Sequence, residues 1–351
     1  MEVGSEFYHN SVTKGKNEYQ KLSVYPHRYL VSGITGLGLI ANELKNTSRS
    51  ILVPDYCCSS MIRPFMEQGL EVSFYDAFNL NHVEIADDVD AVLAIDYFGF
   101  ISKDTLAFSQ KCKEQGKLLV VDATQTAFSY AKTYELADYI IVSYRKWFDS
   151  LCAVVYNKNG FTVPESTTEY SVYLDAWRQA AILKEKYIKF SEGEKQNFLD
   201  LYALANKLLH NEYEGFKTRD SEIEIMLTAD SASLRATRRA NAQLLMDEVK
   251  ALSETYDIQL LYHDIEEEDC PLFVPIIVNE NKRHFIHLEL VKSNVYCPCH
   301  WPVNRNYLNR ETRYSRSEIS LVCDQRYGTD EMRMQISALS RALELSTRVE
   351  M

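Results

Sequence analysis

A lysine follows closely on an apolar run in the segment IIVSYRKWF, which spans residues 140–148. The run ends at Ser143, and Lys146 comes three residues later. Lysine is rarely buried, so its simplest explanation is a solvated residue at the end of a strand. A primary amine at the end of an inner strand can instead attack a carbonyl carbon, as lysines do in Schiff-base chemistry. Two neighbouring motifs favour this chemical explanation.

Complementary groups lie in two segments upstream of this lysine. In VVDATQTAF, residues 120–128, an apolar run ends at Asp122 and Gln125 follows three positions later. In SGITGLG, residues 32–38, a glycine-rich turn precedes an apolar helical pattern. Taken singly, the aspartate is typical of a cap or turn, and the glycines are typical of tight packing. Taken together, the segments offer a phosphate cradle at a helix N-terminus, a carboxylate and an amine.

Pyridoxal 5′-phosphate needs these three groups. Lysine forms a Schiff base with its aldehyde, and a carboxylate beside the pyridinium nitrogen keeps the ring protonated, so that the ring accepts electrons from a substrate carbanion. Two opposite charges about 4 Å apart attract by roughly 4 kcal/mol at an effective dielectric near 20. That attraction raises the pKa of the ring nitrogen by more than about one unit. The sequence therefore predicts a pyridoxal-phosphate site.

At these residues the chain resembles the fold-type I, aspartate-aminotransferase-like enzymes, and most closely the DegT-type sugar aminotransferases. SGITGL resembles the phosphate turn of that family, and ILVPDYCCSSMIRPF resembles its second strand–turn–helix. VVDATQTAF resembles the Asp-x-x-Gln/His cofactor motif, and SYRK the Ser-x-x-Lys motif. RRANAQLL, PLFVPIIV, VYCPCHWPV and DQRYGTDEM resemble landmarks of the small domain. The resemblance covers nearly the whole chain and implies a homodimeric aminotransferase with its sites at the subunit interface.

The resemblance also implies a role for each motif residue. Lys146 would hold the cofactor as a Schiff base and move the proton between substrate and cofactor. Asp122 would pair with the pyridinium nitrogen, and Gln125 would hydrogen-bond the ring hydroxyl. The expected phosphate site consists of Ser143 and the backbone around Gly33, Ile34 and Thr35.

The sequence departs from the family pattern in three places. Ile34 stands where the family usually has a hydroxyl residue directly after the first glycine. The position of the aromatic ring that stacks on the cofactor falls at Cys58, with Tyr56 as a nearby aromatic. The segment WFDSLCAVVY after the lysine lacks the expected glycines.

The elements that position these residues follow from the apolar pattern. Strands are expected at 51–53, 72–75, 91–95, 118–121, 139–142 and 153–156, with helical patterns at 58–68 and 103–115. Continuous apolar strands that alternate with helices predict an α/β fold, in which a mostly parallel sheet lies between two helical layers. Ligands of such sheets bind beyond the carboxyl ends of the strands, which is where Lys146 emerges.

The remainder of the chain has other patterns. Residues 167–212 are rich in Glu, Lys, Leu and Ala, which predicts helices, and a second long helix is expected at about 233–253. The runs IQLLY, FVPIIV and VYCPCHW, with a closing helix near 330–345, predict a smaller α+β domain. We therefore expect an N-terminal segment at 1–24, a cofactor-binding large domain at 25–230 with a helical excursion at 167–212, and a small C-terminal domain at 231–351.

The composition excludes several classes of protein. The formal net charge is −12 and no basic block occurs, which argues against nucleic-acid binding. No uninterrupted apolar run reaches the roughly 18 residues of a membrane span, and the polar start MEVGSEFYHN does not have the layout of a signal peptide. The eight cysteines lack the spacing of a disulfide scaffold. A cytoplasmic location is the expectation.

Other functions remain open at this stage. A nucleotide-binding dehydrogenase would use the glycines of SGITGLG and Asp55 as the ribose-binding acid, and it would find its Tyr-x-x-x-Lys in Tyr213 and Lys217. That alternative leaves VVDATQTAF and SYRK unexplained. A pyridoxal-phosphate lyase, aldolase or dehydratase would use the same electron sink, and a non-catalytic protein could retain the fold.

A metal site is the least favoured alternative, and no metal is expected. The candidate ligands lack the paired Cys-x-x-Cys spacing of structural zinc; they are Cys57, Cys58, Cys297, Cys299 and His300.

The sequence leaves the substrates open. By resemblance, the donor is an amino acid, with glutamate as first choice, and a keto sugar carried on a nucleotide is a candidate acceptor. The arginines that could meet a substrate carboxylate or phosphate are Arg63, Arg313 and Arg326, although a surface or dimer contact is the simpler explanation for each.

Overall fold

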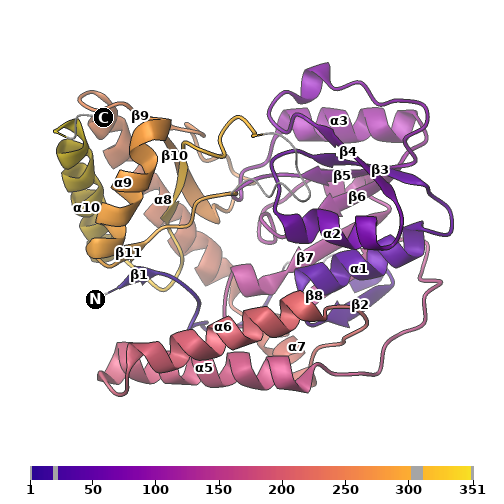
Figure 1. Cartoon of the computed structure of the whole chain (residues 1–351), viewed down its shortest axis with the longest axis horizontal. Helices are drawn as coiled ribbons and strands as arrows, with labels where there is room; N and C mark the ends of the chain where they lie inside the picture. The colour runs from indigo at the N-terminus through magenta and orange to yellow at the C-terminus, as the bar shows by residue number, and fades with distance from the viewer. Residues whose placement is uncertain (1, 19–22, 302–310, 349–351) are drawn as a thin grey trace.

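A seven-stranded sheet forms the centre of the larger lobe of the molecule (Figure 1). The computed structural model describes residues 2–18, 23–301 and 311–348. The strand order is β2-β8-β7-β6-β5-β3-β4, and within this sheet only β8 runs antiparallel to its neighbours. The strands are β2 (His27–Leu30), β3 (Ser50–Pro54), β4 (Glu71–Tyr75), β5 (Ala91–Ile95), β6 (Leu118–Asp122), β7 (Tyr139–Ser143) and β8 (Ala153–Asn157).

Both faces of this sheet are covered. In β6, Leu119 and Val121 belong to one buried cluster with Phe108 of α3 (Lys103–Glu114). Val120 belongs to a second cluster with Ile40 of α1 (Gly33–Leu44). Successive side chains of a strand point to opposite faces, so a continuous apolar run requires two apolar covers. The three-layer α/β architecture with a mostly parallel sheet is therefore confirmed. The helices of this lobe are α1 (Gly33–Leu44), α2 (Ser59–Glu67), α3 (Lys103–Glu114), α4 (Thr133–Leu136) and α7 (Asp220–Leu227).

The glycines at the start of α1 allow this helix to approach the sheet closely. A Cβ on Gly36 would lie 2.2 Å from Cδ1 of Ile141 in β7, and a Cβ on Gly38 would lie 3.0 Å from the ring of Tyr213. A Cβ at position 36 would overlap Ile141, and a Cβ at position 38 would require the Tyr213 ring to shift. The close packing fixes the N-terminus of α1 beside the end of β7.

The smaller lobe contains an antiparallel sheet in the order β12-β10-β9, formed by β9 (Ile258–Leu260), β10 (Phe273–Val278) and β12 (Glu318–Val322). Its helices are α8 (Ser231–Ser253), α9 (Glu280–Lys292) and α10 (Thr329–Thr347). The VYCPCHW run provides only the short strand β11 (Val295–Tyr296), which pairs in parallel with β1 (Val3–Gly4). The third strand of the sheet is instead β12. The last two residues of the VYCPCHWPV landmark lie outside the described residues.

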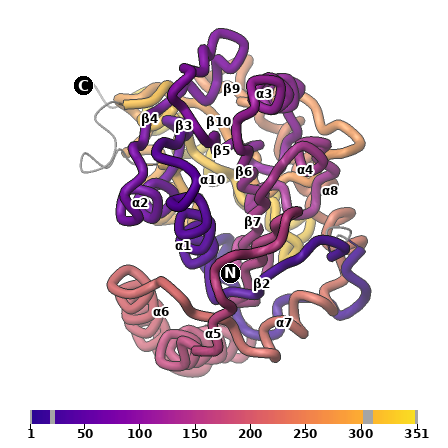
Figure 2. Tube along the Cα trace, turned by 90° about the vertical axis from the view of Figure 1, so that its right-hand side faces the viewer, coloured from indigo at the N-terminus to yellow at the C-terminus, as the bar shows by residue number. Residues whose placement is uncertain are grey.

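Two long helices extend away from the sheet. Helices α5 (Ser171–Phe190) and α6 (Lys195–Asn211) occupy the segment for which helices were predicted, and Figure 2 shows them side by side. The boundaries expected at residues 24 and 230 remain predictions, and parts of the 1–24 and 231–351 segments lie outside the described residues. Over the part of the chain that the structure describes, no helix combines the length and the apolarity of a membrane span.

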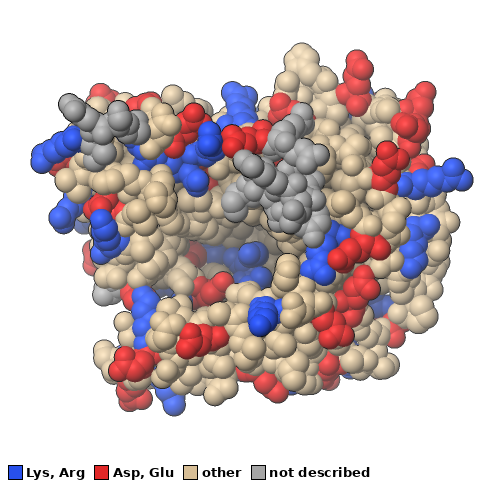
Figure 3. Space-filling view, in the orientation of Figure 1, with Lys and Arg blue, Asp and Glu red and all other residues tan. Residues whose placement is uncertain are grey.

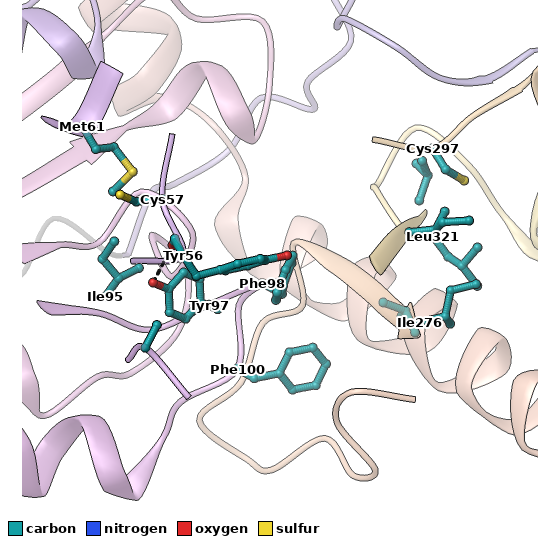
Figure 4. Close-up of a cluster of buried hydrophobic side chains, with 14 of the residues drawn as sticks. Tyr56, Cys57, Met61, Ile95, Tyr97, Phe98, Phe100, Ile276, Cys297 and Leu321 are labelled. Carbon is teal, nitrogen blue, oxygen red and sulfur yellow. Dashed lines mark hydrogen bonds between the residues drawn. The ribbon is translucent and has the colours of Figure 1, made fainter. Parts of the chain in front are cut away.

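A buried aromatic group joins the two lobes. Tyr56 and Tyr97 lie together next to Phe98, and the Tyr97 hydroxyl donates to the Tyr56 carbonyl at 2.7 Å (Figure 4). Ile276 and Leu321 from the small sheet belong to the same cluster. This shared core holds the two sheets on either side of a cavity.

Candidate active site

A cavity of about 560 Å³ lies between the lobes. Figure 3 shows the hollow, with lysine or arginine atoms on its floor. Its walls come from the carboxyl ends of β6 and β7, the N-termini of α1 and α2, residues 4–7, and the segments around β11 and β12 of the small lobe. Of the residues predicted for the site, those that line the cavity are Gly33, Ile34, Cys58, Asp122, Gln125, Ser143 and Lys146.

Asp122 lies at the end of β6 and is 6% exposed. Its Oδ1 accepts a hydrogen bond from the backbone N–H of Thr124 at 2.8 Å. Burial raises the pKa of this carboxyl above its ordinary value, although Thr124 and the positive charge of Lys146 oppose the shift. Among the described residues no cation lies within ion-pairing distance of Asp122. A buried carboxylate in this state would be stabilised by a cationic ligand.

Lys146 ends a single 3₁₀ turn (Tyr144–Lys146) that directly follows β7. Its side chain is exposed to the cavity, and no described residue forms a hydrogen bond or ion pair with its Nζ. The neighbouring charge of Arg145 and the surrounding protein lower the pKa of the amine, and Glu6, Cys58 and Asp122 act in the opposite direction. A lowered pKa increases the fraction of neutral amine, which is the nucleophilic form.

The side chain of Gln125 is oriented by Phe98, which lies in the connection between β5 and α3. The backbone N–H of Phe98 donates to Oε1 of Gln125 at 2.6 Å, which identifies the oxygen end of the amide. Nε2 has no partner among the described residues, so the amide offers a hydrogen-bond donor to the cavity. Phe98 has a φ of 58° and precedes Gly99 at 91°, so a tight left-handed turn presents this N–H.

Ser143 and the first turn of α1 also line the cavity. A Cβ on Gly33 would lie 3.3 Å from Cβ of Ser143, so a larger residue would crowd the space between them. The Ser32 side chain caps α1 by accepting from the Thr35 N–H, and the Ser32 and Thr35 hydroxyls lie 2.8 Å apart. Thr35 therefore faces the cap rather than the cavity. The backbone N–H groups of Gly33 and Ile34 remain as the candidate anion donors of this helix end.

Cys58 occupies the cavity wall at the start of α2, with its Sγ 2.9 Å from the Ser60 hydroxyl. Tyr56 does not take the place of an aromatic ring there, because it is 1% exposed and its hydroxyl donates to the His300 carbonyl at 2.5 Å. Trp301, whose ring centroid lies 5.2 Å from that of Tyr56, does line the cavity.

Large buried side chains follow Lys146 where the family pattern has glycines. Trp147 is fully buried, and its Nε1 donates to the Thr124 carbonyl at 2.7 Å. The guanidinium of Arg238 lies 4.7 Å from the Trp147 ring centroid, and Gln325 donates to the Trp147 carbonyl at 2.7 Å. These contacts fix the backbone that carries Lys146, and the sequence patterns did not identify them.

The N-terminal segment contributes residues that the motifs did not predict. Glu6 lines the cavity and lies 4.0 Å from Arg145, whose guanidinium stacks 4.5 Å from the Trp177 ring centroid. Arg326 also lines the cavity, but Asp324 binds it in bidentate fashion at 3.0 and 2.7 Å, and it donates to the carbonyls of Ser5 and Glu6. Arg326 therefore fastens the N-terminal segment to the small lobe.

The other two candidate arginines are not cavity residues within the described chain. Arg63 pairs with Glu67 at 2.7 Å and donates to the His210 carbonyl. Arg313 is exposed and lies 5.2 Å from the Tyr314 ring centroid.

The dehydrogenase and metal alternatives gain no geometric support. Asp55 is buried, and its Oδ1 accepts from the Ala77 N–H at 3.1 Å; the Tyr213 hydroxyl donates to Glu67. In the described parts of the chain, no group of three or more His, Cys, Asp and Glu side chains is arranged to hold a metal ion.

Solved structures of sugar aminotransferases have the same fold. PseC from Helicobacter pylori, an aminotransferase involved in the biosynthesis of pseudoaminic acid, matches with a TM-score of 0.63 at 13% identity, over 97% of this chain and 94% of that chain. The putative sugar aminotransferase Spr1654 from Streptococcus pneumoniae, in its PLP form, matches with 0.61 at 14% identity, over 99% and 100%. DesI with its TDP-sugar product matches with 0.62 at 13% identity, over 99% and 97%.

The predicted resemblance to fold-type I aminotransferases is thus confirmed at the level of the fold. No protein-family model matches the chain, and neither does any curated protein sequence.

Proposed function

We propose that this chain is a pyridoxal-phosphate-dependent aminotransferase, which moves an amino group from an amino acid donor to a keto acceptor. The observation that carries the proposal is the convergence of Lys146, Asp122 and Gln125 on one cavity. Among the described residues, Asp122 has no ion-pair partner, and Nζ of Lys146 and Nε2 of Gln125 have no hydrogen-bond partner. The cofactor supplies an electron sink for a substrate carbanion when it is bound.

The residues fit this cofactor by their own chemistry. Asp122 is a buried carboxylate with a raised pKa, which suits a cationic ring nitrogen. Gln125 offers an amide N–H, and Gly33 leaves space beside Ser143 where a Cβ would intrude. Lys146 has a lowered pKa and no competing partner among the described residues, so it can bind a carbonyl carbon and later take up and return a proton at Nζ.

The finer features of the proposal come from the sequence patterns and from the family resemblance of the motifs. A homodimer, a cytoplasmic location and covalent attachment of the cofactor at Lys146 are part of it, as is the division into large and small domains near residue 230. DesI was solved with a TDP-sugar product, which supports a nucleotide-linked keto sugar as the acceptor. Glutamate is the proposed donor.

The test begins with the absorbance spectrum of the purified protein after incubation with pyridoxal phosphate. We expect a visible band and, after borohydride reduction, a stable label on Lys146 in peptide mass spectrometry. Lys146→Ala should lose both the band and the label, and Lys184→Ala is the matched control because Lys184 is buried behind the N-terminal segment. A label on another lysine, or none, would contradict the proposal.

The reaction type is tested by adding donors one at a time under single-turnover conditions. A donor alone should remove the visible band and release its keto acid, with glutamate fastest. Proton transfer by Lys146 contributes about a hundred- to ten-thousand-fold to such a step. If the cofactor labels Lys146 but no donor releases a keto acid, the chemistry is that of a lyase or aldolase, or the role is non-catalytic.

A further inference from the structure

A histidine on the small-lobe wall faces the same cavity as Lys146. His300 follows β11, lines the cavity, and its side chain is 14% exposed. Its ring packs edge-to-face on Phe98 and on Trp301, with centroids 5.4 and 5.0 Å away. The Tyr56 hydroxyl holds its carbonyl. Both lobes therefore fix the position of this ring.

A buried serine and glutamate lie behind the ring. Nδ1 of His300 is 2.9 Å from Oγ of Ser320, and Ser320 donates to Oε1 of Glu318. The other oxygen, Oε2, accepts from the His300 backbone N–H at 2.6 Å and lies 3.7 Å from Nδ1. The Glu318 side chain is fully buried. Burying a carboxylate costs free energy unless the group is hydrogen-bonded, so the Glu318 side chain is stable here only with these hydrogen bonds in place.

The network specifies which ring nitrogen carries the proton. An ionised carboxylate only accepts hydrogen bonds, so the single hydroxyl proton of Ser320 goes to Glu318. Oγ of Ser320 can then only accept from His300, which places a proton on Nδ1. Nε2 has no partner among the described residues, and His300 lines the cavity. In the neutral ring, Nε2 therefore presents a lone pair on the cavity side of the network.

We propose that His300 is a second proton-carrying residue of this cavity, held by Ser320 and Glu318 so that Nε2 meets the substrate. The proposal rests on the proposed amino-group transfer and adds a residue to it. Here Ser320 orients the base His300, and the buried carboxylate of Glu318 orients Ser320. Such a chain of orienting groups behind a base is typical of acid–base sites.

The proton balance of the transfer defines what His300 does. The exchange of oxygen for nitrogen at the keto carbon has two stages. When the amino group adds, the first C–N bond forms, the C–O double bond becomes a single bond, and Nε2 takes one proton from the nitrogen and gives it to the oxygen. When water then leaves, the remaining C–O bond breaks, the second C–N bond forms, and Nε2 again moves one proton from the nitrogen to the departing hydroxyl. The amino group thus loses the two hydrogens that the water gains, and His300 returns to its starting state after each stage. Glu318 stabilises the imidazolium in between.

The first test measures the tautomer and does not require turnover. Long-range ¹⁵N–¹H spectra of ¹⁵N-histidine-labelled, cofactor-free protein should show His300 with a proton on Nδ1 and none on Nε2, at a pH where the ring is neutral. Ser320→Ala removes the acceptor and should shift the proton towards Nε2. A proton on Nε2 of the wild-type ring would overturn the proposal.

The second test uses two substitutions that separate the ring nitrogens. His300→Asn keeps a donor near the Nδ1 position and removes Nε2, whereas His300→Gln places an amide near Nε2 that cannot transfer a proton. In both variants the single-turnover rate should fall by about a hundred- to ten-thousand-fold, and the pH–rate profile should lose one limb. The visible absorbance band and the cofactor affinity should stay the same.

The matched control is His284→Gln. His284 lies on helix α9 of the same lobe, but it is exposed and does not line the cavity. Its rate should remain within about twofold of wild type. If the wild type transfers the amino group and both His300 variants do so equally fast, the role of His300 is wrong while the proposed function stands. If the wild type transfers no amino group, the proposed function fails first and takes the His300 role with it.

Discussion

The two walls of the cavity differ in whether their charged side chains have ion-pair partners. On the large-lobe wall, Asp122 and Lys146 have no ion-pair partner among the described residues, and Nε2 of Gln125 is also unsatisfied. On the small-lobe wall, Arg326 is bound by both oxygens of Asp324 and by two carbonyls of the N-terminal segment. Within the described chain, the charged groups Asp122 and Lys146 of the first wall are thus left without an ion-pair partner. The charged pair Arg326–Asp324 of the second wall is satisfied by the protein itself.

The pKa shifts of the two aspartates also differ between the walls. Burial raises the pKa of Asp122, so folding disfavours its charged form in the absence of a ligand. For Asp324 the pKa is lowered despite its burial, because the charge and the hydrogen bonds of Arg326 outweigh the desolvation. Unpaired buried charges lower the folding stability of the protein, and a ligand that pairs with them raises the stability again.

The largest expected effect comes from Asp122→Asn. The substitution removes the carboxylate that would face a cationic ring nitrogen, a pair worth roughly 4 kcal/mol at about 4 Å and an effective dielectric near 20. We expect the single-turnover rate to fall by about a thousand-fold, with a smaller loss of cofactor affinity. Stopped-flow absorbance and equilibrium titration measure the two quantities.

The same variant also tests the cost of the unpaired charge. Since the pKa of Asp122 is raised in the folded protein, the charged carboxylate destabilises the fold at every pH above its unfolded value. Cofactor-free Asp122→Asn should therefore be more stable than wild type at neutral pH in urea unfolding, and the gain should vanish at acidic pH. Near-normal turnover, or lower stability, would mean that the carboxylate only caps its turn through Thr124.

The sequence predicted the first wall and missed most of the second for a physical reason. Asp122 and Lys146 follow apolar strands, and the carboxyl ends of parallel strands meet at one edge of a sheet. Such residues can be located from local patterns. Their exact roles remain predictions.

The second wall is assembled from distant segments. Glu6 reaches the cavity because β1 pairs with β11, almost 300 residues away, and no local pattern carries that information. Strand β12 was missed because Glu318 and Ser320 interrupt its apolar pattern, although both are buried and satisfied by His300 and by each other. An inner strand that carries buried, hydrogen-bonded polar residues lacks the continuous apolar pattern from which strands are predicted.

The second prediction tests whether Arg326 is structural. The side chains of Arg326 and Asp324 are 2% and 6% exposed, and removing one partner of a buried pair costs about 3–5 kcal/mol. Arg326→Ala should lower the free energy of unfolding by this amount and expose the N-terminal segment to limited proteolysis.

A matched surface substitution gives the control. Arg219 also bridges two carboxylates, those of Glu169 and Asp175, but its side chain is 30% exposed. Arg219→Ala should cost about 0.2–1 kcal/mol. If Arg326→Ala raises KM for one substrate while stability is unchanged, then Arg326 is a substrate anchor and belongs to the first wall.

The third prediction concerns Lys184, which ties the N-terminal segment to α5. Its Nζ donates to the Glu6 carbonyl, and the residue is 2% exposed. Burial and the nearby charge of Arg326 lower its pKa to about 7. The unfolded pKa is about 10.4, so the charged form is disfavoured in the folded state and the penalty is complete below about pH 7.

That penalty sets the sign of the pH dependence. Between about pH 7 and 10.4 the unfolded chain binds more protons at this position than the folded chain, so the contribution of Lys184 to stability rises with pH, by at most about 1.4 kcal/mol per pH unit. Lys184→Met removes the titrating group and, with it, a hydrogen bond worth about 1 kcal/mol. In urea unfolding from pH 6.5 to 10, the stability of Lys184→Met relative to wild type should be highest at the lowest pH and should decline steadily as the pH rises. A difference that stays constant over this range would mean that folding does not lower the pKa of Lys184.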